Sequence, residues 1–121
     1  MQKILIIEDE TALNQSLGEF LKEEGYRIVS AFDGEEGTRI AKKEKPSLIL
    51  LDIVLPKKDG YEVLDELKKD PETKNIPIIL LTNLESPEDI QKAFDKGATT
   101  YLVKSDYKME DIANKIKETL K

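Results

Sequence analysis

The chain has 121 residues, which suits one compact domain with one core and is too short for two domains. It carries 25 aspartates and glutamates against 19 lysines and arginines, and the formal charge of -6 disfavours direct binding to nucleic acid or to an anionic membrane. Cysteine and histidine are both absent, which excludes disulfides, the usual zinc sites, and Cys-His or Ser-His catalysis. Any chemistry must therefore use carboxylates, hydroxyls, lysines and bound ions.

Short apolar segments are predicted to be buried parallel strands, because they are rich in isoleucine and leucine and are separated by amphipathic stretches. The longest apolar runs have four residues, too few for a membrane span or the core of a signal peptide, so we expect a cytoplasmic protein. The second segment is the least apolar and is expected at an edge of the sheet. The predicted strands are Lys3–Ile7, Tyr26–Ala31, Leu48–Leu51, Ile76–Leu81 and Thr99–Val103.

Helices are predicted between and after these strands. The first ends before Gly25, the second runs from about Glu35 to Lys43, and the third ends before Asp70-Pro71. The segment Ser86–Asp89 supplies a cap, a proline at the first helical position and acids near the positive end of a fourth helix, which Gly97 closes. The residues expected to face inward on the first, second, third and fifth helices are Leu13, Leu17, Phe20, Leu21, Ile40, Ala41, Val63, Leu64, Leu67, Met109, Ile112, Ala113, Ile116 and Leu120.

The alternation of strand and helix predicts an open, doubly wound α/β sheet with right-handed connections. Ligands in such folds bind outside the carboxyl ends of the strands. The residues that follow the strands are Glu8-Asp9 after the first, Asp52 after the third, Thr82 after the fourth and Lys104 after the fifth. Three carboxylates, a hydroxyl and an ammonium group are therefore expected on one rim of the domain.

Carboxylates that converge on one rim repel one another unless a cation lies among them. Oxygen ligands without nitrogen or sulfur select a hard ion, and we predict Mg²⁺, with Mn²⁺ as the alternative. With the ion bound, a carboxylate can attack a phosphoryl group while the ion and Lys104 neutralise the phosphoryl oxygens and Thr82 donates a hydrogen bond. Taken singly, each residue has a structural explanation: Asp9 can cap a helix, Thr82 can bond a loop backbone, and Lys104 can lie in solvent.

The acidic pair Glu8-Asp9, the segment Asp52–Gly60, Thr82 and the segment Tyr101–Lys104 carry a resemblance to a known family. Over essentially all of its 121 residues the chain resembles the receiver domain of a two-component response regulator, of the chemotaxis-type single-domain kind. The resemblance implies one receiver domain over residues 1–121. It also implies a flavodoxin-like, five-stranded parallel sheet in the order 2-1-3-4-5 with five helices.

The resemblance assigns the metal and phosphorylation site residue by residue. Asp52 resembles the phosphoacceptor. Asp9, Asp52 and the backbone carbonyl of Val54 resemble direct magnesium ligands, and Glu8 is expected to act mostly through a metal-bound water. The resemblance thus implies an aspartyl phosphate that forms only with the divalent ion present.

Further residues of the resemblance concern the phosphoryl group and the switch. Thr82 and Lys104 resemble the residues that hold the phosphoryl group. Tyr101 resembles an aromatic switch that turns inward when Thr82 moves, although a partly buried core tyrosine explains it equally well from sequence alone. Pro56 and Gly60 resemble turn residues that shape the loop beyond Asp52.

The chain departs from the family pattern beside the site. Ser105 follows Lys104 where the family usually has proline, and a peptide bond before serine is expected to be trans. Asn83 is larger than the small residue that often follows the threonine and is expected to narrow access for small phosphodonors. Val54 and Leu84, which flank the path of the hydrolytic water in receivers, are apolar, and we therefore predict slow self-dephosphorylation.

The function implied is a phosphorylation switch. A sensor histidine kinase, a histidine phosphotransfer protein or a small phosphoanhydride donates, and the face built from the fourth helix, fifth strand and fifth helix then changes its affinity for an unknown downstream protein. The chain would catalyse only its own phosphorylation and dephosphorylation, and it would not be an enzyme acting on a metabolite. No direct nucleic-acid or membrane partner is expected.

Alternative functions on the same fold remain open at the level of sequence. A flavodoxin-like electron carrier is disfavoured because Glu8-Asp9-Glu10 would repel a flavin phosphate. A phosphohydrolase with an aspartyl-phosphate intermediate lacks its usual second aspartate, since Val54 occupies that position and cannot transfer a proton. The closest rivals are a receiver-fold interaction module that works without phosphorylation and a receiver excised from a multidomain regulator.

Overall fold

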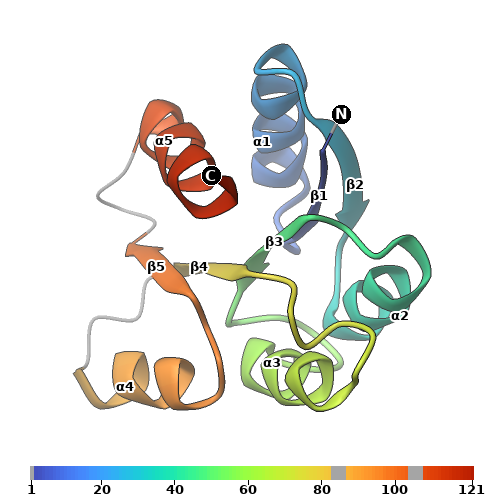
Figure 1. Ribbon diagram of the computed structural model, residues 1–121, viewed down its shortest axis with the longest axis vertical. Helices are drawn as coiled ribbons and strands as arrows, with labels where there is room; N and C mark the ends of the chain where they lie inside the picture. The colour runs from blue at the N-terminus through green and yellow to red at the C-terminus, as the bar shows by residue number, and fades with distance from the viewer. Residues whose placement is uncertain (1, 83–86, 104–107) are drawn as a thin grey trace.

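Strands and helices alternate along the whole of the chain that the computed structural model describes, which is residues 2–82, 87–103 and 108–121. Ten elements follow one another (Figure 1), as the sequence predicts. Their bounds are β1 (Lys3–Ile7), α1 (Thr11–Glu23), β2 (Arg27–Ala31), α2 (Gly34–Glu44), β3 (Leu48–Asp52), α3 (Gly60–Lys69), β4 (Ile78–Thr82), α4 (Pro87–Asp95), β5 (Thr100–Val103) and α5 (Met109–Leu120).

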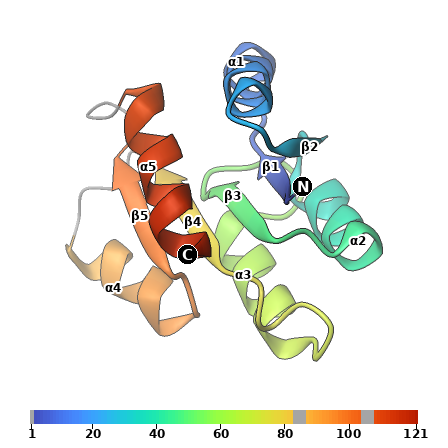
Figure 2. The ribbon, with the colours of Figure 1, turned by 45° about the horizontal axis from the view of Figure 1, so that its top comes forward.

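The strands form one parallel sheet in the order β2-β1-β3-β4-β5, which confirms the predicted flavodoxin-like fold and the predicted edge position of β2. Helices α1 and α5 cover one face of the sheet, and α2, α3 and α4 cover the other (Figures 1 and 2). Because every strand is parallel, all the carboxyl ends lie along one edge of the sheet. The residues that close β1, β3 and β4 are thereby brought together at that edge.

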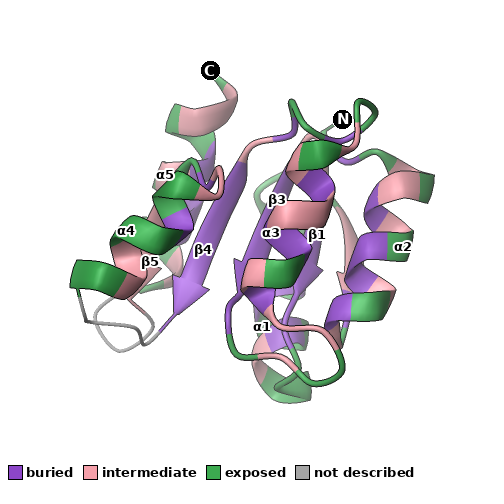
Figure 3. Ribbon diagram, turned by 90° about the horizontal axis from the view of Figure 1, so that it is seen from below, coloured by how far each residue is buried: buried purple, intermediate pink, exposed green. Residues whose placement is uncertain are grey.

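The buried apolar residues form two clusters, one on each face of the sheet. The single core predicted from the length of the chain is therefore divided in two by the sheet. Ala41 and Leu64 belong to the cluster beneath α2, α3 and α4, whereas Leu17 and Ile112 belong to the cluster beneath α1 and α5. Two clusters arise because successive side chains of a strand point to opposite faces. Strands β3 and β4 are buried throughout (Figure 3), so they separate the two clusters as a buried layer.

Strand boundaries differ from the prediction by one or two residues. Strand β4 begins at Ile78, because Ile76 belongs to the preceding turn, where its N–H bonds the carbonyl of Thr73, and Pro77 has no N–H for the ladder. Asp52 and Thr82 lie within β3 and β4, paired in register with Leu81 and Val103. The two polar residues are therefore held by the strand ladder and not by a loop.

Helix ends follow the predicted signals closely. Gly25 and Gly97 have φ angles of 100° and 109°, which favour glycine after a helix. Helix α2 is slightly longer than predicted, since Asp33 caps it by accepting a hydrogen bond from the N–H of Glu36. Ser86, the predicted cap of α4, lies outside the described residues.

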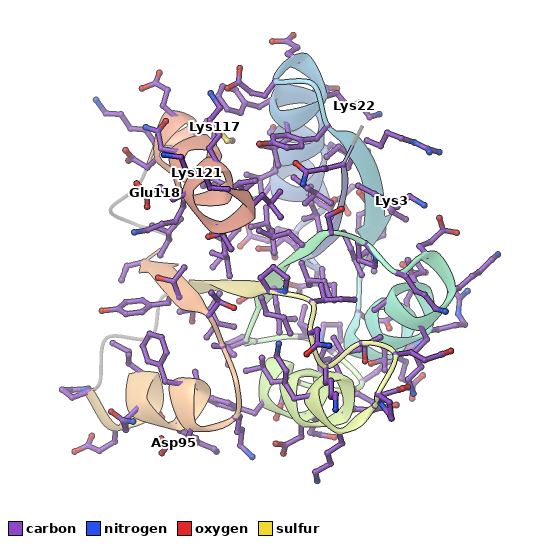
Figure 4. The ribbon with its side chains drawn as sticks, in the orientation of Figure 1. Lys3, Lys22, Asp95, Lys117, Glu118 and Lys121 are labelled. Carbon is purple, nitrogen blue, oxygen red and sulfur yellow. The ribbon has the colours of Figure 1, made fainter. Side chains whose placement is uncertain are left out.

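Charged side chains lie on the outer surfaces of the helices, as Lys22 on α1, Asp95 on α4 and Lys117 on α5 illustrate (Figure 4). Among the described residues, no helix is long and apolar enough to cross a membrane.

Candidate functional site

A cluster of carboxylates lies at the carboxyl edge of the sheet, where β1 and β3 end side by side. Glu8, Asp9 and Asp52 each place one carboxylate oxygen so that all three oxygens lie within 4.8 Å of one another. Glu8 and Asp9 directly follow β1, and Asp52 is the last residue of β3, the neighbouring strand. The sequence prediction that these three acids meet is confirmed.

The three carboxylates differ in their exposure to solvent. The side chains of Glu8 and Asp52 are buried, with relative exposures of 1% and 5%, whereas Asp9 is exposed. The N–H of Glu10 donates to Glu8 Oε2 at 3.1 Å, and the N–H of Val54 donates to Asp52 Oδ1 at 3.2 Å. The cluster is thus anchored in the protein on one side and open to solvent on the side of Asp9.

The donor set of this cluster fits a hard divalent cation. Its ligand atoms are carboxylate oxygens, with no nitrogen or sulfur among them, and ions such as Mg²⁺ and Mn²⁺ prefer such oxygens and keep several waters. Three negative charges within 4.8 Å repel one another strongly, and a divalent cation removes that repulsion. The arrangement is an acidic metal-binding site.

Thr82 and Tyr101 lie on β4 and β5, the next two strands after β3 in the sheet. Thr82 closes β4 and is 1% exposed, while Tyr101 is half-buried in β5. Both residues line one small, largely enclosed pocket between α4 and the sheet, together with Leu80 and Phe94. The ring of Tyr101 meets that of Phe94 edge to face, with centroids 5.9 Å apart. The side chains of Thr82 and Tyr101 therefore border the same small space beneath α4.

The loop between Asp52 and α3 is held tightly against the end of β3. The N–H of Gly60 donates to the carbonyl of Ile53 at 2.7 Å, and a Cβ on Gly60 would lie 2.5 Å from the Ile53 Cα. The carbonyl of Pro56 accepts from the N–H of Lys58 at 2.8 Å. These contacts agree with turn roles for Pro56 and Gly60. Gly60 also begins α3, and Val54 projects into solvent with 70% exposure.

Lys58 of this loop and Lys42 of α2 both bind the carboxylate of Glu66 on α3. Hydrogen bonds from Lys58 and Lys42 lower the pKa of Glu66, although burial of this carboxyl opposes that effect. The pair Lys42–Glu66 is 2.9 Å long. The loop beyond Asp52 is thereby tied to the outer helices on one face of the sheet.

Several residues predicted for the site lie outside the described residues, namely Lys104, Asn83, Leu84 and Ser105. Their expected positions, and the geometry of the Lys104-Ser105 peptide bond, stay predictions. The described part of the site consists of the acid cluster, Thr82, Tyr101 and the loop from Ile53 to Gly60.

Asn14 on α1 is a residue of this region that sequence reasoning missed. It is completely buried, and its side-chain N–H groups donate to the backbone carbonyls of Glu8 and Ala31 at 3.0 and 3.1 Å. The available signal is its spacing: Asn14, Leu17 and Leu21 follow the helical repeat, so the asparagine occupies an inward position of an apolar stripe. A polar residue at such a position needs hydrogen-bond partners inside the protein.

Comparison with known proteins agrees with this geometry. Residues 4–117 match the model of the response regulator receiver domain family. The DNA-binding dual master transcriptional regulator RpaA of Synechocystis is 36% identical over 121 residues, which are 100% of this chain and 50% of that protein. The chain spans about half the length of the curated relatives it matches.

Solved structures show the same fold. A CheY-like receiver domain protein from Methanospirillum hungatei has a TM-score of 0.92 and 32% identity, covering 99% of this chain and 94% of that one. The Mn²⁺-bound form of response regulator Rcp1 has a TM-score of 0.82 and 31% identity, covering 98% of this chain and 91% of that one.

Proposed function

We propose, since this chain belongs to the response regulator receiver domain family, that it is a phosphorylation switch whose phosphoacceptor is Asp52. The observation that carries the proposal is the burial of the Asp52 carboxylate at the end of β3, with oxygens of Glu8 and Asp9 within 4.8 Å. A receiver domain is typically not an enzyme in the usual sense, and we propose that this chain catalyses only reactions of its own aspartate. The family match favours this function over the electron-carrier and phosphohydrolase alternatives.

In the proposed reaction, a carboxylate oxygen of Asp52 attacks the phosphorus of a phosphohistidine on a sensor kinase or a phosphotransfer protein. An O–P bond forms, and the N–P bond breaks with its electron pair passing to the imidazole nitrogen of the donor. The hydrogen bond from the Val54 N–H to Asp52 Oδ1 fixes the orientation of the carboxylate. Little reorganisation is then needed before attack.

Mg²⁺ is the proposed metal, with Mn²⁺ as the alternative. Asp9, Asp52 and the backbone carbonyl of Val54 are the proposed ligands, and Glu8 is proposed to act through a bound water. When bound, the ion neutralises charge on the transferring phosphoryl oxygens. Burial of Glu8 and exposure of Asp9 support this division of roles, because the exposed side leaves room for solvent and for the phosphoryl group.

Thr82 and Lys104 are proposed to hold the phosphoryl group, and Tyr101 is proposed as the switch. The shared pocket beneath α4 supports the pairing of Thr82 and Tyr101, since a shift of either residue alters the space open to the other. The face formed by α4, β5 and α5 is the proposed surface that changes its affinity for a downstream protein.

We propose that residues 1–121 form one receiver domain of the cytoplasm. A chemotaxis-type, single-domain regulator stays a prediction, and so does the alternative of a receiver within a longer regulator. An interaction module that works without phosphorylation is the main functional rival. The assembled acid cluster favours phosphorylation over this rival, because a module that only docks has no need of three acids within 4.8 Å.

Intact mass spectrometry after incubation with Mg²⁺ and acetyl phosphate tests the proposal. Wild type should gain one phosphoryl group, Asp52→Asn should gain none, and the exposed control Glu62→Gln should behave as wild type. Chelation of divalent metal should abolish the adduct in wild type. An adduct of equal stoichiometry in Asp52→Asn would exclude Asp52 as the acceptor.

A further inference from the structure

Asn14 occupies an unusual position in the core of the domain. It lies on the inner side of α1, in line with Leu17 and Leu21, and none of its surface is exposed. Burying an amide among apolar neighbours is unfavourable unless the amide is hydrogen-bonded. The hydrogen-bond partners of the Asn14 side chain therefore indicate why this buried position holds an amide.

The partners of Asn14 lie at the carboxyl ends of β1 and β2. Nδ2 donates to the carbonyl of Glu8 at 3.0 Å and to the carbonyl of Ala31 at 3.1 Å. The carbonyl of Ala31 also accepts from the N–H of Glu8 at 3.1 Å. The backbone of Glu8 is thus held on both sides, through its own N–H and through its carbonyl, and Asn14 supplies one of these two contacts directly.

This restraint is transmitted to the acid cluster through the turn at the start of α1. The carboxylate of Glu8 accepts from the N–H of Glu10, and the carbonyl of Glu10 accepts from the N–H of Asn14 at 2.9 Å. The turn 8–10 therefore lies between the end of β1 and the start of α1, and Asn14 links these two elements by hydrogen bonds. The same turn carries Asp9 and places it beside Asp52.

The unused oxygen of Asn14 shows which half of the amide matters. Oδ1 is buried and has no hydrogen-bond partner within the part of the chain that the structure describes. A buried acceptor in this state destabilises the fold. An apolar side chain of similar size would avoid that penalty, but it would leave the carbonyl of Glu8 without the Asn14 donor. The part of the Asn14 amide that forms hydrogen bonds is therefore its pair of N–H donors.

We propose that Asn14 is a positioning residue for the divalent-metal site. One of its N–H contacts holds the carbonyl of Glu8 directly, and the other holds the carbonyl of Ala31, which itself accepts from the N–H of Glu8. Together these contacts keep the carboxylates of Glu8 and Asp9 in the arrangement that binds the ion. This inference rests on the proposed function, which supplies the metal. Groups that orient metal ligands without touching the metal typically change affinity by about 10-fold to 100-fold when they are removed.

Isothermal titration with Mg²⁺, and with Mn²⁺ as a second probe, tests this role on the full chain. Asn14→Leu keeps the forked shape of the side chain but removes both donors, and its Kd should rise by about 10-fold or more. Leu17→Ala is the matched control, because Leu17 is equally buried on the same face of α1 and does not bond the turn. It should lower the melting temperature at least as much as Asn14→Leu and leave Kd within about 2-fold.

A second pair of variants keeps the test decisive if Asn14→Leu folds poorly. Asn14→Gln retains the two donors, whereas Asn14→Met has similar length and none, so the glutamine variant should bind Mg²⁺ more tightly. Equal Kd values in this pair, or a wild-type Kd in folded Asn14→Leu, would overturn the positioning role. If wild type itself binds no Mg²⁺, and Asp9→Asn is indistinguishable from it, the proposed metal site fails and not merely the role of Asn14.

Discussion

Val54 follows Asp52 by two residues and lies open to solvent. Its N–H bonds the Asp52 carboxylate, and its side chain, 70% exposed, is apolar. Such a side chain cannot orient the water that hydrolyses an aspartyl phosphate. We therefore predict slow self-dephosphorylation, with decay faster by roughly ten-fold when Val54→Asn and Leu84→Glu are combined, which equals about 1.4 kcal/mol in the barrier.

The measurement for this prediction is loss of the phosphoryl adduct with time after removal of the donor, at fixed pH and Mg²⁺. Val54→Ala is the control, because it opens the same space without adding a polar group. Decay of the double variant at the wild-type rate would show that these two positions do not set the lifetime. Equal acceleration by alanine would assign the effect to access and not to water orientation.

Two glycines show how strongly local space decides the effect of a single methyl group. A Cβ on Gly34 would lie 1.8 Å from the carbonyl oxygen of Lys58, so a backbone segment would have to shift to make room. A Cβ on Gly18, within α1, would lie 3.4 Å from Ile28 Cγ2, an ordinary contact. Gly34→Ala should destabilise the fold by about 2–3 kcal/mol, and Gly18→Ala should stabilise it by about 0.5–1 kcal/mol. Urea unfolding midpoints measure both, and similar values for the two variants would contradict the packing argument.

At the scale of the elements, Glu66 joins α3 to α2 and to the loop beyond Asp52 through Lys42 and Lys58. Its pKa is lowered in the folded state by hydrogen bonds from Lys58 and Lys42, so the ionised form is favoured by folding. The resulting stability is present above the ordinary pKa of a glutamate and is lost as pH falls through the lowered value. Since the side chain is 37% exposed, the contribution is limited to about 0.5–1 kcal/mol.

Glu66→Gln should therefore be less stable than wild type at pH 7 and should approach wild type in acid. Urea unfolding between neutral pH and about pH 3 measures the difference at each pH. Glu19→Gln, an exposed substitution on α1, serves as the control and should follow wild type throughout. A constant difference at all pH values would mean that Glu66 acts through packing and not through its charge.

The order and type of the elements were predictable from sequence because strands and helices have different apolar periods here. The four-residue isoleucine and leucine runs mark β1, β3 and β4, which are buried on both faces. Strand ends were less predictable: Asp52 is polar, yet its backbone pairs opposite Leu81, and ladder pairing does not depend on side-chain polarity. The strand order itself came from family resemblance and not from the apolar pattern.

The acid cluster was predictable because Glu8, Asp9 and Asp52 follow or close adjacent strands, and parallel strands align such positions. The positioning role of Asn14 was not predictable from sequence, because it depends on hydrogen bonds to two backbone carbonyls. Every residue has a backbone carbonyl, so the sequence does not indicate which ones a side chain will bond. Chain length alone predicted one core and did not predict the division of the apolar residues into two clusters. That division depends on helices covering both faces of the sheet.

At the scale of the whole molecule, the acid cluster opposes folding when no cation is bound. Three carboxylates place oxygens within 4.8 Å of one another in a chain whose formal net charge is -6. Asp9→Asn or Asp52→Asn should therefore raise the stability of the metal-free protein at neutral pH by about 0.5–2 kcal/mol. Mg²⁺ at ten times its Kd should stabilise wild type by about 1.4 kcal/mol, or roughly 5 °C in melting temperature.

Thermal unfolding with and without Mg²⁺ measures these effects in wild type and the two variants. Both variants should respond less to Mg²⁺ than wild type. Ca²⁺ at the same concentration and ionic strength distinguishes selective binding from general screening of charge. Equal magnesium shifts in all three proteins would argue against a metal site at this cluster.

Strand β1 lies in the interior of the sheet, between β2 and β3, although it is the first strand of the chain. During synthesis, β2 reaches it soon, but β3 begins only at Leu48. The nascent chain must add roughly 40 residues after β1 before the second edge of β1 is paired, a delay of about 2–8 s at typical translation rates. For that time the apolar edge of Ile4–Ile7 is open to pairing with a neighbouring nascent chain, so we expect aggregation through β1 to arise during synthesis and to end once β3 has paired.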